Sequence, residues 1–247
     1  MLNSNRVNRG GGRPLTVQRN ALESNEVIAK KNKAIFGRTF VINFLSSPGS
    51  GKTSLLESII PVLKSEGFKS AVIEGDVETD LDKKRIDNLG IPAYQIITNG
   101  TCHLDAKMIN GSLDNLDIKD ADVIFIENVG NLVCPTSFNL GEDMKVVVLS
   151  ITEGDDKPLK YPAAFYKSKV MVINKIDLLP VLDSDISKIK ENALSINKDL
   201  IIFETSCKKK QDGGVYNKGI EDLVSFIEGK VKLKADEFQR TGNSMYF

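Results

Sequence analysis

Short runs of apolar residues, each about the length of a β-strand, recur along the chain and alternate with segments of helical periodicity. Nearly continuous apolar runs are typical of strands that are buried on both faces of a parallel sheet. The pattern predicts an α/β fold: a doubly wound, mainly parallel sheet flanked by helices, with ligands bound at the carboxyl ends of the strands. The expected strands are 40–45, 69–74, 93–97, 121–127, 144–151, 169–173 and 200–203, and the expected helices are about 52–66, 80–89, 103–116, 183–197 and 218–229.

Polar segments on both sides of this region set the expected organisation of the chain. Residues 1–15, rich in Asn, Arg and Gly, predict a flexible N-terminal tail, and residues 16–37 predict a polar amphipathic helix with Thr16 as its N-cap. That helix has too few apolar residues to stand alone, so we expect it to pack on the main domain or on another subunit. Residues 38–230 form the expected main domain, and residues 231–247 predict a loosely ordered C-terminal tail.

The first expected strand runs into a loop of small residues and then into a helix. This segment carries a phosphate-binding P-loop pattern in Pro48, Gly49, Ser50, Gly51, Lys52, Thr53 and Ser54. Glycine and serine let backbone N–H groups surround a phosphate, and the start of the helix adds a partial positive charge. Lys52 is expected to reach the β- and γ-phosphates, and the Thr53 hydroxyl to coordinate Mg²⁺. Ser46 replaces the first glycine of the usual G-x-x-x-x-G-K-S/T pattern.

A second motif, at the end of a later strand, selects the base. The segment 174–177 reads Asn174-Lys175-Ile176-Asp177. A carboxylate at Asp177 can accept hydrogen bonds from both N1–H and the 2-amino group of guanine, whereas adenine would leave it unpaired. The Lys175 stem can lie over the ring, and Asn174 can brace the loops. After the last strand, a backbone amide and the lysine of Thr205-Ser206-Cys207-Lys208 are expected to complete the base pocket. Ser206 and Cys207 are counted among the nucleotide-binding residues, with Cys207 as a structural residue of that loop. The motif predicts GTP.

Acidic residues after two other strands are candidates for the remaining phosphate chemistry. Asp76 follows the second strand and is the expected Mg²⁺ carboxylate, directly or through water; the alternative is a solvated acidic turn. Glu127 follows the fourth strand and is expected either to bind the metal through water or to orient the attacking water. Gly130 is expected to sense the γ-phosphate. The expected catalytic residues are therefore Lys52, Thr53, Asp76 and Glu127.

Two of the three cysteines and the only histidine form a candidate transition-metal site. Cys102 and His103 come directly before an expected helix, where we place the thiol in the first turn; Cys134 lies on the loop after Gly130. Thiolate and imidazole are donors that suit Zn²⁺ or Ni²⁺. Three ligands leave the site open to water or shared across a dimer. The alternative is an ordinary buried thiol at Cys134 and a chance pair at Cys102 and His103.

The composition of the chain argues against several other classes of protein. The 247 residues contain 33 basic and 33 acidic side chains, so net charge gives no indication of nucleic acid or membrane binding. No apolar run approaches the length of a membrane span, and the start lacks a signal peptide's apolar core. Three cysteines are too few for a disulfide scaffold, so a cytoplasmic location with reduced thiols is expected. One histidine excludes metal motifs that need two.

Over about residues 16–230 the chain resembles the HypB family of nickel-handling GTPases, which act in the maturation of nickel–iron hydrogenases. The resemblance rests on the P-loop from Ser46, on Glu74-Gly75-Asp76, on Asn174-Lys175-Ile176-Asp177, and above all on two strings around the cysteines, Gly100-Thr101-Cys102-His103-Leu104 and Glu127-Asn128-Val129-Gly130-Asn131-Leu132-Val133-Cys134-Pro135. It implies a P-loop NTPase of the SIMIBI-like G-domain type that converts GTP and water to GDP and phosphate.

The resemblance also implies partners and metals. It implies a GTP-dependent homodimer whose interface binds Ni²⁺ or Zn²⁺ through residues matching Cys102, His103 and Cys134. It implies a HypA-like nickel chaperone as partner and a hydrogenase large-subunit precursor as the recipient of nickel. Because no cysteine precedes Cys102 and there is one histidine, the N-terminal nickel capture of some relatives is not expected here.

Other readings stay open at this stage. One is a urease-type, UreG-like nickel GTPase, although its Cys-Pro-His string is absent. Another is a P-loop small-molecule kinase that prefers ATP, and a third is a zinc-stabilised scaffold in which the nucleotide only holds a dimer. Turnover is expected to be slow, since neither an arginine finger nor a water-orienting glutamine is evident. The roles of Asp155, Asp156 and Lys157 are left open.

Overall fold

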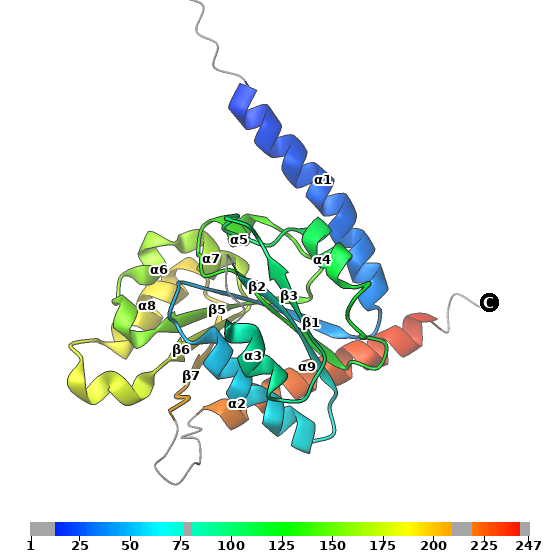
Figure 1. Cartoon of the computed structure of the whole chain (residues 1–247). Coiled ribbons are helices and arrows are strands. Elements are labelled where there is room, and N and C mark those ends of the chain that lie inside the picture. Colours follow the sequence, from blue (N-terminus) through cyan, green and yellow to red (C-terminus); the bar gives the residue numbers. More distant parts are fainter. Residues whose placement is uncertain (1–12, 77–80, 209–218, 243–247) are drawn as a thin grey trace, which may run out of the picture.

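The computed structural model describes residues 13–76, 81–208 and 219–242. Its centre is a seven-stranded sheet in the order β3-β2-β4-β1-β5-β6-β7, and each described pair of neighbouring strands is parallel (Figure 1). The predicted doubly wound sheet is confirmed, with small shifts at the strand ends. The strands are β1 Phe40–Ser46, β2 Ser70–Asp76, β3 Ala93–Ile97, β4 Val123–Glu127, β5 Met144–Ser150, β6 Val170–Asn174 and β7 Ile201–Glu204.

Helices cover both faces of the sheet because side chains alternate along each strand. Phe40, Ile42 and Phe44 of β1 share one core with three helices, whereas Val41 points into a second core on the opposite face. The first face carries α2 Lys52–Ser65, α3 Leu81–Asp87 and α9 Ile220–Gly242, and the second carries α1 Arg13–Phe36, α4 Ala106–Ser112, α7 Pro162–Lys167 and α8 Ile186–Ile196. None of the described helices has the length and apolar character needed to cross a bilayer.

Several short helical turns were not predicted. Each is too short to show a helical period in the sequence. These turns are α5 Cys134–Ser137, α6 Lys157–Lys160, α7 Pro162–Lys167, and the 3₁₀ segments η1 Ile151–Glu153 and η2 Ile176–Val181. They lie in the segments that follow β4, β5 and β6.

The N-terminal helix is longer than predicted. Thr16 lies inside α1, so its assignment as the N-cap is wrong: the helix already contains Arg13 and Pro14. Proline is tolerated in a first helical turn because its missing N–H would have no partner there. The N-terminal half of α1 projects away from the body of the molecule (Figure 1). Residues 1–12 of the predicted tail lie outside the described residues.

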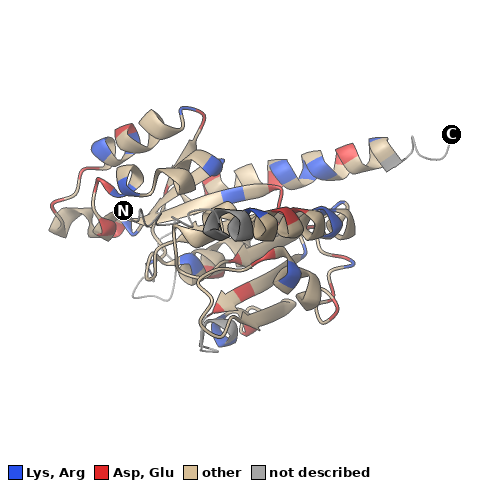
Figure 2. Ribbon diagram, turned by 90° about the horizontal axis from the view of Figure 1, so that it is seen from above, with Lys and Arg blue, Asp and Glu red and all other residues tan. Residues whose placement is uncertain are grey.

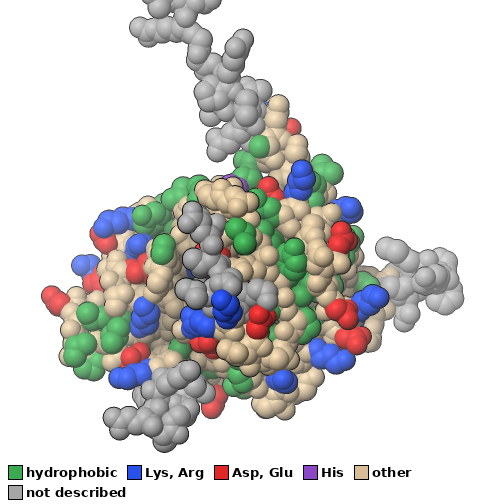
Figure 3. All heavy atoms as spheres, in the orientation of Figure 1, with side chains coloured by type: hydrophobic (Ala, Val, Ile, Leu, Met, Phe, Trp, Pro, Cys, Tyr) green, Lys and Arg blue, Asp and Glu red, His purple; other side chains and the backbone are tan. Residues whose placement is uncertain are grey.

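The predicted C-terminal tail is wrong as far as residue 242, because α9 continues without a break to Gly242. Val231 is buried on the sheet, and the Lys234 ammonium donates to the Thr39 carbonyl and pairs with Asp143. Beyond this contact, α9 carries basic and acidic side chains (Figure 2). This polar sequence is the reason that a loosely ordered tail was predicted. Basic and acidic side chains are also mixed over the face seen in Figure 3. Residues 243–247 lie outside the described part.

The buried contact of α9 predicts a measurable loss of stability. Val231→Asp places an unpaired carboxylate in the core, where Val231 is only 4% exposed, and is expected to lower the free energy of unfolding by about 3 kcal/mol. Leu233→Asp is the matched control, because Leu233 is 55% exposed on the same helix. Urea unfolding compares the two. Similar losses for both variants would show that α9 beyond Gly229 does not pack on the sheet.

Candidate functional site

A cavity of about 500 Å³ opens at the carboxyl ends of β1, β2 and β4. This is the edge of an open α/β sheet where ligands bind, and the volume is in the range of small-molecule sites. The P-loop, the ends of β2 and β4 and the loops after them supply its wall. The lining residues are Pro48, Gly49, Gly51, Lys52, Thr53, Ser54, Glu74, Gly75, Asp76, Arg85, Glu127, Asn128, Val129, Gly130 and Lys175.

The P-loop presents its lysine to this cavity. Helix α2 begins at Lys52, so the positive end of the helix faces the same space. The Lys52 ammonium is buried and lies 2.8 Å from the Ser46 Oγ, which in turn donates to the Ser47 carbonyl at 2.7 Å. The serine that replaces the usual first glycine therefore gives the lysine a hydrogen-bond acceptor inside the loop. Ser50, also predicted here, is buried and is not among the residues that line the cavity.

Oxygen donors converge beside the lysine. The Thr53 hydroxyl donates to the Glu127 carboxylate at 2.8 Å, and Glu74 lies directly opposite Glu127 in the β2–β4 register. Asp76 is half-buried at the end of β2 and lines the same cavity. A hydroxyl with several carboxylates is the kind of donor set that Mg²⁺ accepts. Glu74 was missed by sequence reasoning; its signal was an acidic residue inside an otherwise apolar strand.

The base motif is joined to the P-loop by its asparagine. The Asn174 Nδ2 donates to the Ser50 carbonyl at 3.0 Å, and its Oδ1 accepts from the Thr205 hydroxyl at 3.1 Å. Asn174 thus connects the P-loop to the loop after β7, as predicted. The fully buried Thr205 also takes part in this contact. The Cys207 thiol lies 3.6 Å from the same Oδ1. Burial raises the pKa of Cys207 to about 11, so this thiol stays protonated at neutral pH.

The other two residues of the motif face the loops on either side. The Lys175 ammonium donates to the Gly49 carbonyl at 2.6 Å, which brings its stem against the P-loop. The Ser206 hydroxyl donates to the Asp177 Oδ1 at 2.7 Å, so the loop after β7 holds the carboxylate that was assigned to the base. Neither Asp177 nor Ser206 lines the cavity described above; they lie at the end of the sheet beyond Lys175.

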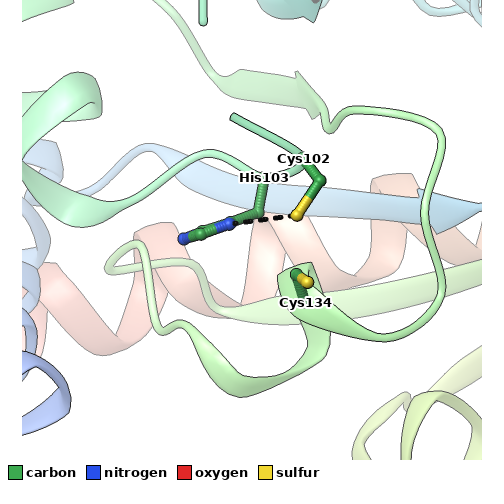
Figure 4. Close-up of side chains that lie close together, drawn as sticks. All are labelled: Cys102, His103 and Cys134. Carbon is green, nitrogen blue, oxygen red and sulfur yellow. Dashed lines mark hydrogen bonds between the residues drawn. The ribbon is translucent and has the colours of Figure 1, made fainter. Parts of the chain in front are cut away.

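The predicted transition-metal residues come together. Ligand atoms of Cys102, His103 and Cys134 all lie within 4.8 Å of one another, with Cys102 exposed and the other two half-buried (Figure 4). The Cys102 Sγ is 3.8 Å from the His103 Nδ1. The expectation that Cys102 opens a helix is wrong, because Asp105 caps α4 by accepting from the Met108 N–H at 2.8 Å. Both residues of this pair lie on the loop before that cap.

The surroundings of the cluster affect two of its three groups. Burial lowers the pKa of His103, against an opposing effect of Asp105, which favours the neutral imidazole that binds metals. A hydrogen bond with Cys102 and, to a smaller extent, burial raise the pKa of the Cys134 thiol. The His103 ring stacks on Phe138 with centroids 4.0 Å apart. This stacking restricts the rotation of the imidazole ring.

One loop connects the cluster to the cavity lined by the P-loop. It leaves Glu127 at the cavity wall, runs through Asn128 and Gly130, and ends at Cys134. The Asn128 Oδ1 accepts from the Leu104 N–H at 3.1 Å, directly after His103. A side chain at Gly130 would lie 3.0 Å from the Pro48 backbone, so the loop touches the P-loop. Asn128 was missed in the sequence, where only its neighbours had an assigned chemistry.

The three residues with open roles contact other parts of the domain. The Asp155 carboxylate accepts from the Asp185 N–H at 3.3 Å, and Asp156 pairs with Lys160. Lys157 pairs with Glu153 at 3.2 Å. None of the three lines the described cavity or belongs to the described cluster. Their observed contacts hold the segment around α6.

A P-loop on a parallel sheet, with carboxylates at the adjacent strand ends, defines the class of P-loop nucleotide-binding proteins. The family model described as "CobW/HypB/UreG, nucleotide-binding domain" matches residues 40–204. The chain belongs to the HypB family of hydrogenase maturation factors, so the predicted resemblance is confirmed.

Similar proteins support this placement. The hydrogenase maturation factor HypB of Escherichia coli (strain K12) is 48% identical over 218 residues, covering 87% of this chain and 72% of that protein. The hydrogenase/urease maturation factor HypB of Helicobacter pylori (strain J99) is 38% identical over 226 residues, with 89% and 88% covered. The crystal structure of HypB from Helicobacter pylori in complex with nickel superposes with a TM-score of 0.76 at 38% identity, covering 86% of this chain and 97% of that one.

Proposed function

We propose that this chain is a GTP-hydrolysing metallochaperone that carries Ni²⁺, or Zn²⁺ in its place, at the Cys102, His103 and Cys134 cluster and assists nickel insertion into a hydrogenase. The observation that carries the proposal is the single loop that leaves Glu127 at the cavity wall and ends at the Cys134 thiol. The names of the relatives and the nickel complex of the Helicobacter pylori protein support it. The same relative is named for urease, so a urease target is the second possibility.

In this proposal the cavity holds GTP. Asp177 pairs with guanine, and Lys52 neutralises the β- and γ-phosphates from its place at the start of α2. Thr53 and the carboxylates of Asp76 and Glu127 would hold Mg²⁺, which would supply positive charge beside the phosphate oxygens. Gly130, in contact with the P-loop, detects the terminal phosphate. Among the described residues that line the cavity the only arginine is Arg85, which is held by Glu57 and Ser54, so turnover is slow.

Nickel is cargo in this proposal, and the cluster is built to release it. Three ligands leave a fourth position for water or for a second copy of the chain. Cys102 is exposed and Val133, beside Cys134, is 60% exposed, so the cluster opens onto the surface and suits a homodimer interface. A HypA-like nickel chaperone would load this site, and a hydrogenase large-subunit precursor would receive the ion.

Hydrolysis drives release through the shared loop. Loss of the terminal phosphate frees Gly130 and Asn128, and Asn128 bonds directly to the segment that carries His103. A nucleotide can shift nickel affinity only by binding the two loop arrangements differently. The proposal therefore requires a measurable difference between the two nucleotide states.

Nickel affinity measured by calorimetry with a GTP analogue and with GDP is expected to differ by about tenfold, which is about 1.4 kcal/mol. Cys134→Ala is expected to abolish binding at this site, because it removes one of three ligands. Cys207→Ala, measured without nucleotide, is the matched control, since Cys207 is also half-buried but belongs to the base loop. Equal affinities with both nucleotides would refute the coupling, and unchanged binding by Cys134→Ala would refute the site.

A further inference from the structure

Helix α1 carries two buried asparagines on one face. Asn25 is 7% exposed and Asn32 is fully buried, and the two lie about two helical turns apart. A carboxamide without hydrogen-bond partners is costly to bury, so both side chains need specific partners. Most of α1 is polar and exposed, whereas these two residues are buried against the main domain.

Each of these side chains bonds to the same two segments. The Asn25 Oδ1 accepts from the Ala106 N–H and its Nδ2 donates to the Asn139 carbonyl, both at 2.8 Å. The Asn32 Nδ2 donates to the Ala106 carbonyl at 2.8 Å and to the Leu140 carbonyl at 3.0 Å. Each of the two carboxamides thus bridges the start of α4 and the loop after α5.

These two segments carry the metal ligands. Ala106 follows the loop that holds Cys102 and His103, and residues 139–140 follow the short helix that begins with Cys134. Phe138 of the second segment stacks on the imidazole of the first. The spacing of the three ligand atoms therefore depends on how closely these segments are held together.

A glycine lets the second segment reach the helix backbone. Gly141 has a φ of +94°, and a Cβ there would lie 2.7 Å from the Ala29 carbonyl oxygen and 2.9 Å from the Asn32 Cβ. No larger residue fits between the loop and α1. Helix α1, residues 139–141 and the start of α4 are therefore packed together, and the side chains of the two asparagines hydrogen-bond to both of the other segments.

We propose that Asn25 and Asn32 are positioning residues of the metal cluster: they hold the segment of Cys102 and His103 and the segment of Cys134 at ligand spacing. The inference rests on the proposed function of the cluster. An asparagine that only anchored α1 would need to bond one segment, whereas each of these bonds both. Residues that orient ligands in this way commonly change metal affinity by 10–100-fold when replaced.

The first test uses metal-free protein and reads the geometry alone. Ferricyanide takes two electrons in total from Cys102 and Cys134, two protons are lost, and a disulfide forms at a rate that depends on the approach of the two sulfurs. Asn25→Asp is the chosen variant because it keeps the acceptor for Ala106 and the volume but removes the donor to Asn139. Its disulfide, identified by mass spectrometry, is expected to form about tenfold more slowly than that of the parent.

The second test uses Co²⁺ as the probe in the full chain. Asn25→Asp and Asn32→Ala are expected to raise the Kd for cobalt about tenfold and to weaken the thiolate-to-cobalt absorption. Asn197→Ala is the matched control: its Nδ2 also donates to backbone carbonyls, those of Phe165, Tyr166 and Ser168, but beside α7 and α8. If Asn32→Ala does not fold, Asn25→Asp alone decides.

The outcomes separate the two proposals. Slower disulfide formation and weaker cobalt binding in the Asn25 variant, with Asn197→Ala near the parent, support the positioning role. Parent-like values in the Asn25 variant, or an equal loss in Asn197→Ala, overturn it. A parent protein without thiolate-to-cobalt absorption would overturn the metal site itself, and the disulfide rates would still report whether the asparagines hold the segments.

Discussion

Replacement of Lys52 by alanine is expected to lower GTP hydrolysis at least about a hundredfold, because a preplaced positive charge on the transferring phosphate is lost. Lys52 is buried at the start of α2, within the cavity, and its ammonium is already held at 2.8 Å from Ser46. The loss should appear in the turnover number at saturating GTP as well as in affinity. Phosphate release measured over a range of GTP concentrations separates the two effects.

Lys69→Ala is the control for this loss. Lys69 pairs with Asp120 on the opposite edge of the sheet and its side chain is 66% exposed, so hydrolysis should stay at the parent rate. If Lys52→Ala hydrolysed GTP at the parent rate, Lys52 would have no part in catalysis. If the parent protein bound GTP but released no phosphate, the nucleotide would be a structural ligand and the protein a scaffold rather than an enzyme.

Replacement of Asp177 by alanine is expected to weaken GTP binding about a thousandfold, since two hydrogen bonds from guanine lose their charged acceptor. Asp177→Asn makes a sharper prediction. The asparagine keeps an oxygen for the Ser206 hydroxyl and for N1–H but presents an N–H₂ group in place of the second oxygen. That group repels the 2-amino group of guanine and suits the 2-oxo group of xanthine, so the variant should prefer xanthosine triphosphate.

Competition binding of GTP, xanthosine triphosphate and ATP to parent and variants tests this prediction. Asp183→Asn is the matched control, because Asp183 is an exposed aspartate a few residues farther along the same loop. A parent protein that bound ATP as tightly as GTP would contradict the assignment and favour the small-molecule kinase. A preference that survived both Asp177 substitutions would move base recognition to another part of the chain.

The sheet could be predicted from the sequence because a strand buried on both faces must be apolar almost throughout. The P-loop and the base motif were equally visible, since each places unusual residues directly after a strand. The cysteine pair with its histidine was also predictable as a cluster, and the structure brings the three ligand atoms within 4.8 Å. The cap at Asp105 was not predicted: it starts α4 after Cys102 and His103, so neither residue belongs to the helix.

The remaining misses depend on contacts between distant parts of the chain. The end of α9 is polar, and its order comes from Val231 on the sheet and from Lys234 against Thr39 and Asp143. Asn25 and Asn32 look like ordinary residues of a surface helix until their carbonyl partners are known. No local pattern contains that information, because the partners lie many residues away.

The hydroxyl of Ser46 has a consequence for the empty protein. In a loop with glycine at that place, an approaching phosphate would be the main acceptor for the lysine, whereas here an acceptor is built into the chain. If the proposed GTPase cycle is correct, the Lys52 ammonium therefore keeps a hydrogen-bond acceptor within its own loop after the nucleotide has left.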